Sequence, residues 1–182
     1  MDRKNLNIRT LGDKSPQLGQ DCFIDPFACI SGDVALGDQA SVWPFASIRG
    51  DLMPIRIGAR TNIQDNAVLH TTHASDFFAG AGLTIGNDVT IGHGAICHAC
   101  TLGHRVLIGM NATVLDNAVI QDDVIVGAGS LVPPGKTLES GYLYIGSPVK
   151  QARKLTQTEL DFLKYSAASY IKLAQKHLLN NF

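Results

Sequence analysis

The sequence lacks a long apolar run, an excess of charge and a rich set of cysteines, and each absence argues against a class of protein. No apolar stretch approaches the ~20 residues of a membrane-spanning helix. Lys and Arg number 15 against 16 Asp and Glu, a net charge of −1, which argues against nucleic acid or an anionic membrane as the main partner. Four cysteines in 182 residues are too few for a disulfide scaffold. The N-terminal residues lead into no apolar signal segment, so we expect a cytoplasmic protein.

Glycine is abundant instead, with 18 residues, and it belongs to a repeat. Aliphatic residues recur six positions apart, and a small or β-branched residue follows nearly every one of them four places later. The series, which includes one cysteine, is Leu18, Ile24, Ile30, Leu36, Val42, Ile48, Ile57, Ile63, Leu69, Ile85, Ile91, Cys97, Leu102, Ile108, Val114, Ile120, Val126 and Val132. This period fits neither an α-helix nor a plain strand, but it fits short strands joined by tight corners.

Such a repeat predicts an all-β fold. The aliphatic residue points inward, the small residue fits a narrow interior, and glycine relieves the corner. Coils would stack as parallel strands about 4.8 Å apart, because one coil cannot bury its inner face alone. We predict a left-handed parallel β-helix of hexapeptide repeats with an N-terminal lead-in over residues 1–150, the handedness being that of the known class. The alternative, a flat β-sandwich with chance spacing, does not explain so regular a series.

The repeat is interrupted twice. Three residues are inserted between Ile48 and Ile57, and about ten residues bulge out between Leu69 and Ile85, near residues 73–82. Loops on a rigid scaffold often carry function, so we expect the bulge to lie near a site.

The C-terminal part has a different pattern. Residues 137–150 read as irregular, with a turn at Gly146-Ser147-Pro148. The segment Thr156-Gln157-Thr158-Glu159 matches a capping box, which opens a helix. We expect residues 151–182 to form a C-terminal α-helix that packs on the β-helix or on a neighbouring subunit.

Three histidines hold related places in the repeat. His70 and His98 each follow an inward-facing residue directly, and one coil plus the bulge separates them. They should therefore stack at one corner on successive coils, roughly 5 Å apart at the backbone. His93 lies on the preceding face, so within one chain it would struggle to share a metal ion with the other two. Across an interface with a second chain it could.

Three imidazoles with an open fourth position are the donor set of a catalytic zinc ion. Two other interpretations stay open: exposed histidines are often ordinary surface residues, and a lone histidine at a hexapeptide corner can be the general base of an acyltransferase. Cys97 and Cys100 form a C-x-x-C pair, but Cys97 falls in the inward register, which favours a place in the core.

Several segments resemble the gamma-class carbonic anhydrase family in order and spacing. They are Ile48-Arg49-Gly50-Asp51, Asn62-Ile63-Gln64-Asp65, Leu69-His70, and Ile91-Gly92-His93 followed by Cys97-His98. Residues 141–148 and the terminal helix resemble a bacterial subgroup of the family. The resemblance spans about residues 15–178.

This resemblance implies a homotrimer with a zinc ion, or Fe2+ or Co2+, at each subunit interface. His70 and His98 would come from one subunit and His93 from the next. It also implies the reversible hydration of CO2 to bicarbonate by metal-bound hydroxide.

The resemblance assigns roles to further residues. Gln64 and Asn62 would orient the hydroxide and CO2. Arg49 would contact bicarbonate or pair with an acidic neighbour such as Asp65. Tyr165, early in the terminal helix, matches a position near the site in some members.

One departure from the family bears on activity. Asp51 would help to order the interface, but Leu52 follows it where the archaeal enzymes have a proton-transferring Glu. Three hypotheses therefore stay open: a carbonic anhydrase of high or low activity, a hexapeptide acyltransferase or thioesterase acting on coenzyme A esters, and a catalytically weak metal-binding trimer.

Overall fold

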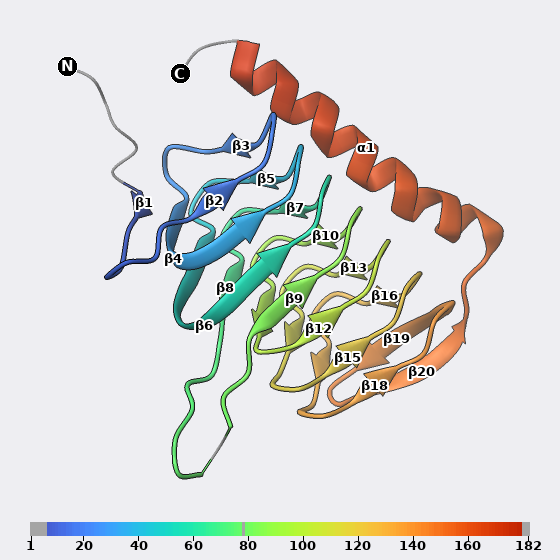
Figure 1. Ribbon diagram of the computed structural model, residues 1–182. Coiled ribbons are helices and arrows are strands. Elements are labelled where there is room, and N and C mark those ends of the chain that lie inside the picture. Colours follow the sequence, from blue (N-terminus) through green and yellow to red (C-terminus); the bar gives the residue numbers. More distant parts are fainter. Residues whose placement is uncertain (1–6, 78, 180–182) are drawn as a thin grey trace.

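The computed structural model describes residues 7–77 and 79–179 as a left-handed parallel β-helix of about eight turns, with a helix laid along it (Figure 1). The strands are β1 (Ile8–Arg9), β2 (Gln17–Leu18), β3 (Phe23–Ile24), β4 (Cys29–Leu36), β5 (Ser41–Val42), β6 (Ser47–Ile57), β7 (Asn62–Ile63), β8 (Val68–His70), β9 (Leu83–Ile85), β10 (Thr90–Ile91), β11 (Ile96–His98), β12 (Thr101–Leu102), β13 (Leu107–Ile108), β14 (Thr113–Val114), β15 (Val119–Ile120), β16 (Ile125–Val126), β17 (Leu131–Val132), β18 (Thr137–Leu138), β19 (Tyr142–Gly146) and β20 (Val149–Lys154). The helix is α1 (Gln157–Leu179). The predicted fold class is confirmed.

The strands stack on three faces of the coil. One face carries β3, β5, β7, β10, β13, β16 and β19, the next carries β8, β11, β14 and β17, and the last carries β9, β12, β15 and β18. The long strands β4 and β6 turn the corner between the last two faces, so that β6 pairs with β8 at its start and with β9 at its end. The insertion that follows Ile48 is therefore absorbed within β6.

The aliphatic series forms the core, as predicted. From Ile30 to Val132 each member is at most 4% exposed, and the members pair in register from coil to coil, as Leu69 does with Cys97. Ile24 is partly buried, and Leu18 is 42% exposed. Its strand, β2, lies at the end of the stack and pairs with β4 alone, so no further coil covers this side chain.

The glycines next to the aliphatic residues serve a different purpose from the one predicted. The backbone of Gly37 is not in the left-handed region, but a Cβ there would lie 2.5 Å from the backbone nitrogen of Ala59 in the next coil. Positive φ angles fall instead on residues further along each corner, such as Gln39 and Arg60. Glycine is required because successive coils approach closely, which leaves no room for a side chain.

The bulge between β8 and β9 leaves the stack as a long loop (Figure 1). Its neck is closed by paired hydrogen bonds between Thr72 and Ala81, at 3.1 and 3.0 Å. The loop thus starts at the corner that carries His70.

The expectation of an irregular segment at 137–150 is wrong. β18 and β19 continue the stack, and β19 pairs antiparallel with β20 across the predicted turn, with Gly146 opposite Val149. The antiparallel strand β20 covers the last coil and directs the chain toward the helix. The six-residue spacing in fact continues through Leu138 and Tyr144, which are buried, and only the antiparallel strand β20 departs from it.

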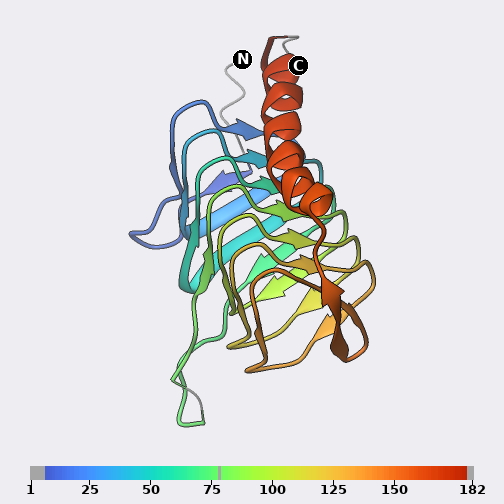
Figure 2. The ribbon, with the colours of Figure 1, turned by 90° about the vertical axis from the view of Figure 1, so that its right-hand side faces the viewer.

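The helix α1 begins with the predicted capping box. The Glu159 amide donates to Thr156 Oγ1 at 3.2 Å, and the Thr156 amide donates to the Glu159 carboxylate at 2.8 Å. The helix then runs back along the stack, as Figures 1 and 2 show, and buries Leu163, Ala167 and Ala174. Among the described residues, no helix combines the length and apolar character that crossing a membrane requires.

Candidate metal centre

Two histidines from adjacent strands face each other at one corner of the coil. β8 and β11 pair in register, which places His98 next to His70. His70 Nδ1 lies 3.2 Å from His98 Nε2, and the ring centroids are 5.2 Å apart. The predicted stacking of these two imidazoles is confirmed, and it follows directly from the parallel register of the coils.

A carboxylate holds each of these rings from its far side. His70 Nε2 is 3.0 Å from Asp51 Oδ1 in the coil before it, and His98 Nδ1 is 3.0 Å from Asp116 Oδ1 in the coil after it. The Thr72 hydroxyl donates a further hydrogen bond to Asp116. Four successive coils thus present one column in the order Asp, His, His, Asp. Carboxylates in this position select the tautomer and orientation of a metal-binding imidazole.

The carboxylates determine what the two inner nitrogens can do. When His70 Nε2 and His98 Nδ1 donate to carboxylates, the facing nitrogens of the neutral rings both carry lone pairs. Two acceptors cannot hydrogen-bond to each other, so their approach requires a proton or a cation between them. Burial lowers the pKa of His70, despite the opposing effect of Asp51, and so favours its neutral, metal-binding form.

The spacing of the two nitrogens fits a shared ion. Tetrahedral Zn–N bonds of about 2.0–2.1 Å place two nitrogens about 3.3 Å apart, and the observed separation of His70 Nδ1 and His98 Nε2 is 3.2 Å. Within the described part of a single chain, no group of three or more His, Cys, Asp or Glu side chains is placed to hold a metal ion. One chain therefore presents two imidazole donors at this corner.

His93 lies at a different corner, after β10. Its Nδ1 is 2.9 Å from Asp65 Oδ2, so this imidazole also has a carboxylate partner, and its side chain is 48% exposed. His93 and Gln64 line one end of a groove of about 420 Å3 between α1 and the sheet face. The groove continues over apolar residues of β13 and β16. The structure therefore separates His93 from the His70–His98 pair within one chain, as the spacing predicted.

Gln64 and Asn62 lie on the His93 side and are buried. Gln64 Nε2 donates to Asn62 Oδ1 at 3.1 Å, and Asn62 Nδ2 donates to Thr90 Oγ1 at 3.0 Å. Thr90 shares a hydrogen bond of 2.9 Å with Ser166 of α1. These bonds hold the Gln64 side chain at the mouth of the groove, beside His93.

Arg49 pairs with Asp51 rather than with Asp65. Asp65 pairs with His93 at another corner. Asp51, in contrast, is only two residues from Arg49 on the same strand. Burial raises the pKa of Asp51, but Arg49 and His70 lower it further, so the net shift is downward. The expected pairing with Asp65 is corrected, while a contact of Arg49 with bicarbonate stays a prediction.

Tyr165 is not brought to either group of residues in this chain. It is 66% exposed on the outer side of α1, where its ring lies 6.2 Å from that of Phe162. The helix residues that line the groove with His93 include Ser166 and Tyr170. A place for Tyr165 near the site stays a prediction. Cys97 is buried in the core, as its register indicated, and Cys100 is buried as well.

The sequence analysis missed Asp116. A signal was available, because Asp116 follows His98 by 18 residues, close to one full coil. Its function depends on the Thr72 hydroxyl as well, and that side chain comes from the neck of the bulge. The repeat spacing does not show where the inserted bulge lies relative to the next coil, so it could not bring Thr72 to Asp116.

Comparisons with known proteins agree with this geometry. Residues 99–134 match the family model for the bacterial transferase hexapeptide, six repeats. The chain is 52% identical to Protein YrdA of Escherichia coli over 94% of both chains, and 43% identical to a Methanocaldococcus jannaschii protein named Probable carbonic anhydrase, over 81% of this chain and 89% of that one. The chain belongs to the gamma-class carbonic anhydrase family. Within the family it falls in the subgroup of YrdA.

Two further relatives show the range of the family. Gamma carbonic anhydrase 2 of Arabidopsis thaliana mitochondria is 40% identical over 98% of this chain, which spans 64% of that protein. The crystal structure of a hexapeptide transferase family protein from Anaplasma phagocytophilum matches with a TM-score of 0.87 and 40% identity, over 93% of this chain and 97% of that one. The chain is thus similar in sequence to proteins described as anhydrases and similar in structure to one described as a transferase family protein.

Proposed function

We propose that this protein catalyses the reversible hydration of CO2 to bicarbonate as a homotrimer, with a zinc-class divalent cation held between protomers. The observation that carries the proposal is the pair of facing nitrogens on His70 and His98, each ring backed by a carboxylate. A divalent cation at such a site supplies a water molecule whose pKa is lowered to about 7. The third imidazole is His93 of a neighbouring copy.

An exposed apolar face supports the neighbouring copy. On two successive coils the chain passes from the Asp65–His93 corner to the His70–His98 corner through β8 or β11. The outward side chains of these strands, Val68 and Ile96, are 39% and 38% exposed. A second copy that covers this face brings its own His93 edge toward the His70–His98 edge. Such a head-to-tail contact closes into a ring if the rotation permits, and three copies give three equivalent sites.

Two phenylalanines extend the apolar surface at the His93 corner. Phe27 and Phe45 are 66% and 63% exposed, and their rings lie 5.5 Å apart. Phe45 also has a φ of 62°, in the left-handed region that bulky residues rarely adopt. A strained and exposed aromatic residue is costly in an isolated chain, so its presence supports a partner on this surface.

The other side chains position the reactants. Gln64, anchored through Asn62, lies beside His93 and can hold the oxygen of a reactant. The groove that begins there is mostly apolar, which suits uncharged CO2. Arg49, on Asp51 next to His70, supplies a positive charge for the anionic product.

Two observations support the alternative functions, an enzyme acting on coenzyme A esters and a metal-binding trimer of low activity. The match to a transferase-family structure, together with the Asp65–His93 pair, suits a general base acting on a thioester of coenzyme A. Leu52, 41% exposed beside Asp51, leaves this position without a proton-transferring carboxylate and suits a metal-binding trimer of low activity.

Metal content and stopped-flow CO2 hydration test the proposal. We expect about one divalent cation per chain, and hydration that a small imidazole buffer accelerates because the buffer accepts the proton. His93→Ala should lose metal and activity but keep the β-helix. The matched control is His104→Ala, since His104 accepts a hydrogen bond from the Asn87 amide at a corner away from the site. Stoichiometric metal in His93→Ala, or tight coenzyme A binding without metal, would refute the proposal.

A further inference from the structure

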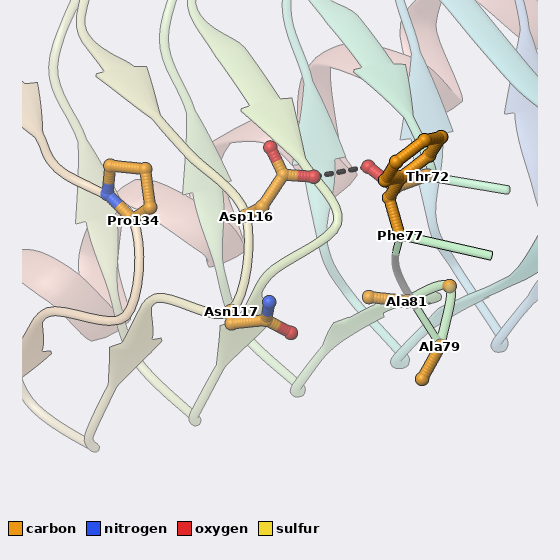
Figure 3. Close-up of a pocket in the computed structure, with 8 residues that line it drawn as sticks. Thr72, Phe77, Ala79, Ala81, Asp116, Asn117 and Pro134 are labelled. Carbon is orange, nitrogen blue, oxygen red and sulfur yellow. Dashed lines mark hydrogen bonds between the residues drawn. The ribbon is translucent and has the colours of Figure 1, made fainter. Parts of the chain in front are cut away.

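A second cavity lies beside the metal corner, between the bulge and the coils that follow it (Figure 3). Its volume is about 570 Å3. The described residues that line it are Thr72, Phe77, Ala79, Gly80, Ala81, Asp116, Asn117 and Pro134. The loop supplies one wall, and the turns after β14 and β17 supply the other. The proposed hydration reaction makes no use of this space.

The charge of the lining is negative. Asp116 is the charged side chain among the described lining residues, and no Lys or Arg in residues 7–77 and 79–179 forms an ion pair with it. Its carboxylate accepts a hydrogen bond from the Thr72 hydroxyl and lies 3.0 Å from His98 Nδ1. An anionic ligand, including the phosphates of coenzyme A, is therefore disfavoured here.

The opposite wall offers an aromatic ring. Phe77 lines the cavity and is 86% exposed, so much of its ring surface is free for a ligand. Figure 3 shows Phe77 and Thr72, whose hydroxyl holds Asp116, on the loop side of the cavity, while Asn117 and Pro134 lie on the coil side. The lining thus combines one carboxylate, one amide side chain, one aromatic ring and small apolar groups.

We propose that this cavity binds a small organic cation, with its ammonium group between Asp116 and the ring of Phe77. An aromatic face together with a carboxylate is the recognition chemistry of alkylammonium groups. A divalent metal ion would need several oxygen ligands, whereas the cavity offers one carboxylate. The small apolar residues Ala79, Ala81 and Pro134 accommodate the hydrocarbon part of the ligand.

Isothermal titration of the full-length protein with benzylammonium tests this site, with benzyl alcohol as the neutral isostere. We expect Kd for benzylammonium below about 1 mM and much weaker binding of the alcohol. Phe77→Ala should weaken binding about fivefold through loss of the cation–π contact. Asp116→Asn should weaken it about tenfold or more, because a charge-assisted hydrogen bond is lost.

Asp76→Asn is the matched control, because this loop carboxylate adjoins Phe77 but is not among the described lining residues. It should bind benzylammonium as the parent protein does. Equal affinity for the alcohol and the cation, or an unchanged Kd in both Phe77→Ala and Asp116→Asn, would overturn the proposal. Binding here needs neither a bound metal nor CO2 hydration, so failure of either proposal leaves the other standing.

Discussion

His70 and His98 occupy equivalent places on adjacent parallel strands, and their facing nitrogens are 3.2 Å apart. Asp51 and Asp116 hold the outer nitrogens of the two rings, each at 3.0 Å. The rings are therefore oriented before any ligand binds, so little side-chain freedom remains to be lost on metal binding. This preorganisation is the basis of the first prediction.

Asp116→Asn should lower the affinity for a divalent cation about 10–100-fold, because an amide no longer selects the tautomer and orientation of His98. The β-helix should be retained, since Asp116 lies outside the core. Zinc affinity by competition with a chelator, together with circular dichroism, measures both effects. Asp76→Asn is the control and should bind zinc normally. Equal zinc affinities in the two variants would show that Asp116 does not orient His98.

Phe45→Asn should stabilise the isolated chain and weaken its assembly. Asn occupies the matching left-handed positions at Asn66 and Asn111, and relief of the strain at Phe45 is worth about 1 kcal/mol. The same change removes an exposed ring from the proposed interface. Sedimentation velocity measures the assembly, and urea unfolding of the dissociated chain measures its stability.

Phe27→Asn provides the matched comparison for Phe45. Phe27 is similarly exposed but does not have a positive φ. Its replacement should weaken assembly without the gain in stability. A Phe45→Asn protein that assembles as tightly as the parent would remove this corner from the interface.

Gly37→Ala should destabilise the protein by about 3 kcal/mol, since the added methyl group would overpack the space between coils. The new Cβ would lie 2.5 Å from the Ala59 nitrogen, so the coils must separate. Gly135→Ala is the control: its φ is 67° but nothing lies within 4 Å of the added atom. That variant should lose only about 1 kcal/mol. Urea unfolding compares the two, and a loss in Gly37→Ala no larger than that in Gly135→Ala would show that the close approach of the coils does not require glycine at this position.

Glu159 makes part of the stability dependent on pH. Arg153 and the Thr156 amide lower its pKa from 4.5 to about 2. Because the folded-state pKa lies below the unfolded one, the unfolded chain binds the proton first as the pH falls. This stabilisation is therefore complete above pH 4.5 and is lost progressively toward pH 2.

Glu159→Gln should accordingly be less stable than the parent at pH 7, and the difference should narrow as the pH falls through that window. Thermal unfolding at several pH values measures the difference. Asp161→Asn is the control, an acidic residue in the same part of the helix whose partner is the neutral Gln157. A gap that stays constant with pH would show that the ion pair with Arg153 contributes nothing.

Much of the site could be predicted from the repeat, because residues one coil apart lie side by side on neighbouring parallel strands. This reasoning placed His98 against His70 and separated both from His93. It did not assign the partner of Arg49, since the resemblance pointed to Asp65 on another corner, whereas the side-chain directions in the folded coil bring Arg49 to Asp51 on its own strand. It also missed β19, where Tyr144 continues the six-residue spacing with an aromatic residue, and the antiparallel strand β20, which departs from that spacing.

The amino-acid sequence alone determined the coil, its aliphatic core and the capped terminal helix, because these depend on local spacing and on burial that repeats with every turn. The tertiary structure alone decided which carboxylate meets which imidazole, why Gly37 carries no side chain, and where the bulge encloses a cavity. Those features depend on contacts between different coils, and the distance between coils at a corner is set by the packing of the whole stack.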